Sequence, residues 1–255
     1  MNLAWHYFRE QRFLMVGYTL LLALNMLGGA LYWPEMRDNF PEMIKFIPFE
    51  PLQDFVRAFE KHGFWAYFCV QHFYKGAGMF GIAAAGLMGT GIVAREVDRR
   101  TAELLLSRPV SRARILFVRW ATGAVMLFVP FLAVAFLSVP LASSVDETLD
   151  LWDLMRGALY SYLFILMAFT ATTALSTRFS HHLKAGMMVL GFMLMHLAIY
   201  MIQDLWDYSL YNLIDLDLVM PIADDAMPWY ETSWMASLTL LFYGLALWSF
   251  RRRDF

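Results

Sequence analysis

"WATGAVMLFVPFLAVAFLSVPLASSV", residues 120–145, runs for 26 positions without a charged side chain. About 20 apolar residues carry an α-helix across the roughly 30 Å hydrocarbon core of a membrane. The run is continuous, whereas membrane β-strands are short and alternate between apolar and polar residues. The stretch therefore predicts a transmembrane helix.

Five further segments have the same character. Across the chain 60% of the residues are hydrophobic and 16% are charged, against about 45–50% and about 25% in soluble domains. We predict an all-α, polytopic membrane protein forming a single transmembrane domain over residues 1–255. Its six transmembrane helices are expected at 13–33, 73–94, 113–142, 155–177, 185–203 and 232–250. A cleaved signal peptide is the weaker interpretation of the first, because the apolar run reaches Trp33 and no A-x-A site follows.

The distribution of charge predicts the orientation. Six crossings leave both termini on one side, and that side carries the basic groups Arg9, Arg12, 95–112, Arg178, Lys184 and Arg251–Arg253. The external segment 204–231 has seven acids and no Lys or Arg. By the positive-inside rule both termini are cytoplasmic. The external segment 34–62 is the exception, with four basic residues beside six acids.

A dense charged stretch separates the second and third predicted helices. "REVDRRTAELLLSRPVSRAR", residues 95–114, holds six of the twenty basic residues. The pairs Glu96–Arg100 and Arg99–Glu103 have the i, i+4 spacing that supports a continuing helix, while Thr101 is alternatively the N-cap of a new one. Pro109 ends the preceding helix, and Ser111 can cap the next, with Arg112, Arg114 and Arg119 expected at headgroup level.

Three consecutive leucines, Leu104–Leu106, stand inside this stretch. They cover more than one face of a helix, and so short a helix is unstable alone in water. They must therefore pack on something. One interpretation is the membrane surface or neighbouring helix ends, and the other is a groove on a soluble partner, with charged residues as a polar rim.

The run from Arg95 to Arg112 closely resembles the segment after the second transmembrane helix of ABC-2 type permeases. That pattern is an acidic residue, a charged spacer, Gly-Thr, and Glu-Leu-Leu-Leu-Ser-x-Pro-Val-Ser-Arg. This chain departs from it at Arg100, where the family usually has glycine, which favours a more continuous helix. The residues that the resemblance assigns to coupling with an ATPase are Glu96, Arg99, Arg100, Thr101, Glu103, Leu104, Leu105, Leu106, Ser107, Pro109 and Arg112.

The resemblance implies the permease subunit of an ATP-driven transporter, exporting a substrate by family analogy. Two copies of the permease, or one copy with a homologous permease, form the path, and two copies of a separate ABC ATPase carry ATP and magnesium. No cofactor, metal or catalytic residue is then expected in this chain, and no nucleic-acid partner. The chain contains no G-x-x-x-x-G-K-[ST] loop, which agrees with a motor on another polypeptide. The implied location is the plasma membrane of a bacterium or archaeon, the inner membrane where there are two.

Two competing functions stay open. A non-transporting scaffold that transmits force in an ATPase complex would keep the same coupling segment. A polytopic membrane enzyme would need a catalytic cluster, and the chain has neither G-x-S-x-G nor H-E-x-x-H. The identity of the substrate does not follow from the sequence.

Several other features carry two interpretations each. Lys75 either snorkels from the end of the second helix or contacts substrate. Cys69 and His72 have a spacing compatible with metal ligands but are too few for a site.

Residues 1–12 are expected to form an interfacial helix that lies on lipid or flanks the ATPase. Segment 34–62 suggests one or two amphipathic helices broken at prolines, and 204–231 is either an acidic outer surface or a lid or docking face for an external partner.

Overall fold

The computed structural model describes residues 3–98, 110–202 and 204–253. Over these residues the chain forms helices and turns without a strand, which confirms the all-helical prediction. Five helices of the described chain contain a stretch long and apolar enough to cross a membrane. They are α1 (Leu3–Asp38), α7 (Arg112–Ser143), α8 (Leu151–Ser176), α9 (His182–Tyr200) and α11 (Trp229–Arg252).

The second predicted span is built from several helical pieces. α3 (Glu50–Phe68) breaks at Gly63, whose φ of 64° and ψ of −146° favour glycine over other residues. From Phe64 the backbone continues through the π-helix η1 (Cys69–Gly81) into α4 (Ile82–Thr90), and the joining residues keep right-handed helical angles. The helical segment therefore begins before the predicted start at residue 73.

The amino-terminal residues join the first long helix. Residues 3–12, expected as a separate interfacial helix, continue into α1 without interruption. The physical reason is that no proline or glycine precedes Gly17 to break the helix. At about 1.5 Å per residue, the 36 residues of α1 are longer than a hydrocarbon core of about 30 Å.

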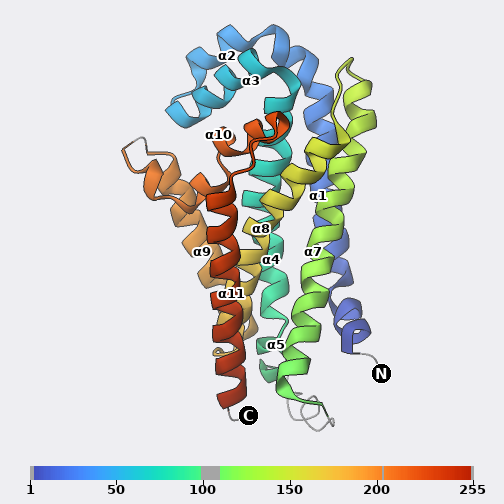
Figure 1. The fold of residues 1–255 in the computed structure, drawn as a ribbon, viewed down its shortest axis with the longest axis vertical. Helices are drawn as coiled ribbons and strands as arrows, with labels where there is room; N and C mark the ends of the chain where they lie inside the picture. The colour runs from blue at the N-terminus through green and yellow to red at the C-terminus, as the bar shows by residue number, and fades with distance from the viewer. Residues whose placement is uncertain (1–2, 99–109, 203, 254–255) are drawn as a thin grey trace.

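The long helices run side by side along the longest axis of the molecule (Figure 1). α8 is the most enclosed of them and packs against α4, α7, α9 and α11, while α1 packs on α7 and η1. Both described ends of the chain, and the short helix α5 (Ala94–Asp98), lie at one end of this bundle (Figure 1). The segments 34–62 and 204–228 cover the other end (Figure 1).

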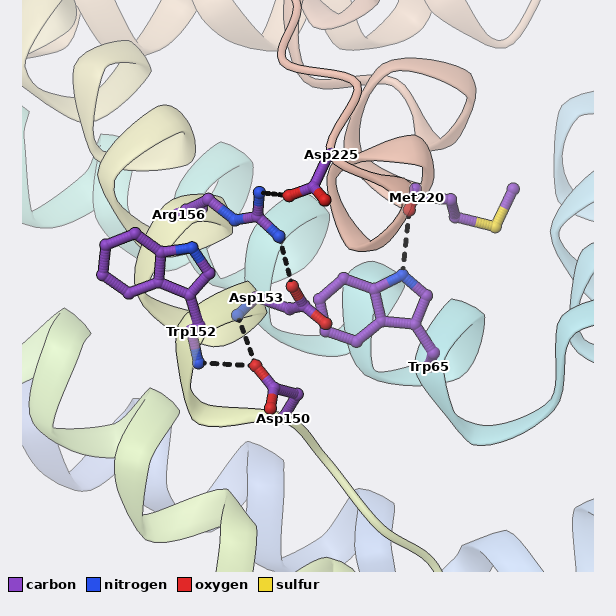
Figure 2. A network of polar contacts seen from close by, with 7 residues as sticks. All are labelled: Trp65, Asp150, Trp152, Asp153, Arg156, Met220 and Asp225. Atoms are coloured by element: carbon purple, nitrogen blue, oxygen red, sulfur yellow. Dashed lines mark hydrogen bonds and ion pairs between the residues drawn. The ribbon is translucent and has the colours of Figure 1, made fainter.

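Side-chain hydrogen bonds cap the amino-terminal ends of two of the long helices. The Ser111 hydroxyl accepts a hydrogen bond from the Arg114 N–H at 3.3 Å, as the sequence predicts. The Asp150 carboxylate accepts from the N–H groups of Trp152 and Asp153, at 2.8 and 3.2 Å (Figure 2). Each cap satisfies backbone donors that a helix start leaves without an intrahelical partner.

Short helices cover the end of the bundle opposite the described termini, and together they form the cap of the bundle. Segment 34–62 contains α2 (Phe40–Phe46) and the first part of α3, separated around Pro48 as its prolines predict. Segment 204–228 folds into four short elements. These are η2 (Trp206–Tyr208), η3 (Leu210–Ile214), α10 (Leu216–Val219) and η4 (Met220–Asp224).

An ion-pair network fastens this cap to the long helices (Figure 2). The Arg156 guanidinium pairs with the carboxylates of Asp153, at 2.5 Å, and Asp225. The indole N–H of Trp65 donates to the carbonyl of Met220 at 3.0 Å. These contacts join 204–228 to the start of α8 and to the segment that leads into η1.

The inner side of the cap is packed rather than solvated. Tyr211 is buried, and its hydroxyl donates to the carbonyl of Gly78 in η1 at 2.6 Å. The Tyr200 hydroxyl donates to the Asp215 carboxylate at 2.8 Å. Burial raises the pKa of the Asp215 carboxyl, and the hydrogen bonds from Tyr200 and the Leu216 N–H partly oppose that rise. The acids of this segment therefore do not all form an outer solvated surface.

Candidate functional site

The predicted coupling segment, 95–112, begins in α5 and ends at the first residue of α7. Of its assigned residues, Glu96 and Arg112 are described by the structure. Nine of them lie outside the described residues: Arg99, Arg100, Thr101, Glu103, Leu104, Leu105, Leu106, Ser107 and Pro109. The site is therefore built from the two ends of the segment and the helices that hold them.

A buried ion pair holds the first end. Arg119 of α7 is fully buried, and its Nη2 lies 2.5 Å from Glu96 Oε1 in α5. Its Nη1 donates to the carbonyl of Ile92 at 2.8 Å. That carbonyl belongs to the turn between α4 and α5, where backbone acceptors lack helical partners. The Glu96 carboxylate and the Ile92 carbonyl together allow the guanidinium to be buried inside the protein.

The start of α1 packs against the same break. The Tyr7 hydroxyl donates to the carbonyl of Met88 near the end of α4, at 2.8 Å. Its ring faces the Arg119 guanidinium, whose central carbon lies 5.9 Å from the ring centroid. Gln11 is fully buried beside Gly91, where an added Cβ would lie 2.1 Å from the glutamine Nε2. A larger residue at that position would require the Gln11 side chain to move, so α1 and the α4–α5 turn are closely packed.

The second end of the segment is held by backbone carbonyls. Arg112 Nη1 donates to the carbonyls of Phe250, Arg251 and Arg253 at 3.2, 3.3 and 2.6 Å. These carbonyls lie at the carboxyl end of α11, where acceptors are unsatisfied and a cation is favoured by the helix dipole. The first residue of α7 is thereby fixed to the last turn of α11.

The same network reaches α8 and α9. The Arg253 guanidinium donates to the carbonyls of Thr177 and Phe179, at 2.7 and 3.1 Å, just after α8. The ring of His181, the residue before α9, lies 3.5 Å from the Asp98 carboxylate of α5. The ends of the coupling segment therefore contact α1, α7, α9 and α11 directly, and α8 through Arg253.

One group at this site has a spacing that metal ligands can have. Ligand atoms of His6, Glu10 and Glu96 lie within 4.8 Å of one another. The Arg119 guanidinium already neutralises Glu96 there, which leaves less charge for a metal cation. The pair considered from the sequence, Cys69 and His72, is buried in η1, and His72 Nε2 lies 3.0 Å from the Phe131 carbonyl.

Both ends of the predicted coupling segment are therefore anchored in packed helices. A displacement applied to this segment would be passed to α7 through the Glu96–Arg119 pair and to α11 through Arg112. Packed elements transmit displacement because their interiors compress little. The arrangement is suited to mechanical transmission and supplies no nucleophile paired with a base among the described residues of this end.

Comparison with known proteins agrees with this class of membrane protein. The sequence profile of the family "ABC-2 family transporter protein" matches residues 9–213 of the 255-residue chain. The chain therefore belongs to the ABC-2 transporter family, as the coupling segment predicts. Members of this family are multi-pass membrane subunits that are not themselves catalytic and generally pair with an ATPase subunit. Among curated proteins none matches the chain.

Proposed function

We propose that the chain is the permease subunit of an ATP-driven exporter. Two copies form the path, and two copies of a separate ABC ATPase, holding ATP and magnesium, dock beneath them through 95–112. The observation that carries the proposal is the anchoring of both ends of this segment, by Glu96–Arg119 and by Arg112 on the end of α11. A segment moved by a soluble motor needs such rigid attachment at both ends.

The proposed topology has six crossings, with both termini in the cytoplasm of a bacterial or archaeal cell. The helical segment from Phe64 to Thr90 is the additional crossing, because at about 1.5 Å per residue it spans roughly 35–40 Å. The presence of both described chain ends at one end of the bundle supports an even number of crossings (Figure 1).

Single cysteines on a Cys69→Ala background test the topology. We expect Glu60→Cys and Ser144→Cys to react with a membrane-impermeant maleimide from outside intact cells, and Lys184→Cys to react only after permeabilisation. All three native side chains are exposed, so access depends on the side of the membrane. If the segment from Phe64 to Thr90 does not cross, positions 60 and 184 will label from the same side and position 144 from the other.

Co-reconstitution with an ABC ATPase of the same organism tests the function. We expect the ATPase to bind liposomes that contain this chain and its ATP hydrolysis rate to change severalfold, because docking couples the two subunits. The control is liposomes without the chain. Equal sedimentation and equal hydrolysis in both preparations would contradict the proposal. A complex that forms but moves no solute would instead favour the force-transmitting scaffold.

A further inference from the structure

A cluster of polar side chains lies near the middle of the second helical segment. Lys75 belongs to η1 and is well inside the helix that runs from Phe64 to Thr90. The sequence places Lys75 at the start of the second predicted span, where it either snorkels or contacts substrate, but the helix begins earlier than predicted. A lysine at this depth has a long way to reach either surface, and ionisable groups at such positions are rare and commonly functional.

The cluster joins η1 to α1. Lys75 Nζ donates to the side-chain oxygen of Gln71 at 3.1 Å. Asn25 of α1 donates from Nδ2 to the backbone carbonyl of Gln71 at 3.0 Å. Among the described residues no carboxylate lies within ion-pair distance of the Lys75 amine. An ammonium with only a neutral partner in an apolar environment is costly unless an anion joins it.

Exposed apolar side chains lie near the cluster on both helices, and the described residues leave them uncovered. Lys75 and Asn25 are half-buried, while Met79, one turn beyond Lys75 on η1, is 48% exposed. On α1, beside Asn25, Leu21 and Leu24 are 52% and 62% exposed. The surroundings of the amine therefore suit an apolar chain, and the amine itself suits a negative charge. The widened π-helix, a form frequent at functional sites, supplies both Gln71 and Lys75.

We propose that Lys75, with Gln71 and Asn25, binds the anionic group of an amphiphilic substrate, a carboxylate or phosphate that carries an apolar chain. The inference rests on the proposed function, because a bound amphiphile is a substrate only if the chain is a permease. The ammonium supplies the charge-assisted hydrogen bond. Gln71 orients the amine, and Asn25 holds the Gln71 backbone against α1.

Photolabelling of the purified permease, without any ATPase, tests the site. The probes are a photoactivatable palmitic acid and the matched photoactivatable palmityl alcohol, in a non-ionic detergent. We expect the acid to label the peptide that contains residues 71–79 about tenfold more than the alcohol, the order expected of one hydrogen bond to a charged group. Lys75→Met is expected to abolish this preference, and Lys75→Arg to retain it.

The matched control is Lys184→Met, which removes an exposed lysine at the start of α9 and should leave the preference unchanged. Equal labelling by the two probes in the wild type, or a preference that survives Lys75→Met, would overturn the proposal. Competition experiments distinguish the two sources of the anion. If only decanoate reduces the labelling, the site takes an amphiphilic anion. If inorganic phosphate also reduces it, the site takes soluble anions, which would overturn the amphiphilic part of the proposal. Because no ATPase is present, failure of the coupling proposal does not affect this result.

Discussion

Replacing Glu96 with leucine is expected to destabilise the chain by about 3–5 kcal/mol, because it leaves a buried charge without its counterion. Arg119 is fully buried and, among the described residues, Glu96 supplies its ion pair. The remaining contacts of the guanidinium, the Ile92 carbonyl and the Tyr7 ring, do not neutralise it. The loss is measured as a lower apparent melting temperature of the detergent-purified protein and a lower yield from membranes.

Two variants make this expectation specific. Glu60→Leu applies the same substitution to an exposed acid of α3 and should change stability by less than about 0.5 kcal/mol. The double variant Glu96→Leu/Arg119→Met should recover most of the loss, because replacing a whole buried ion pair with apolar residues is often neutral. A double variant as unstable as the single one would show that the pair is not what holds α5 to α7.

The positions of the membrane helices could largely be predicted from hydropathy. The charge-free runs around 120–145 and 157–177 each predict one helix, and α7 and α8 lie at these positions. The second span is harder to place from the sequence. Lys75 interrupts its apolar run, so the predicted helix starts only at residue 73. The helix in fact extends back to Phe64, and the lysine therefore lies near the middle of the helical segment from Phe64 to Thr90.

The contacts of the candidate site could not be read from spacing. A lone arginine near the start of an apolar run is usually at the headgroups, and the spacing alone does not show that Arg119 is buried against Glu96. A usable signal exists in hindsight, since Glu96 and Arg119 flank the same loop at the ends of consecutive spans. The contacts of Arg112 could not be predicted in this way. Its hydrogen-bond acceptors are backbone carbonyls of α11, and every residue type has a backbone carbonyl.

Replacing Leu105 with arginine is expected to release the ATPase without preventing membrane insertion. The residue lies outside the described residues, and its assignment to the docking surface comes from the family pattern. Loss of a central apolar contact in a protein interface costs about 2 kcal/mol or more, which corresponds to about thirtyfold in affinity. The introduced charge adds the cost of its desolvation in the groove.

The most direct test of the coupling role is a pull-down from detergent with an ABC ATPase of the same organism. It compares the wild type, Leu105→Arg, and Leu205→Arg, which places the same change on an exposed leucine of the segment 204–228. We predict that the wild type and Leu205→Arg retain the ATPase and that Leu105→Arg loses it. If the wild type retains no ATPase, or Leu105→Arg retains it fully, residues 95–112 are not the coupling segment.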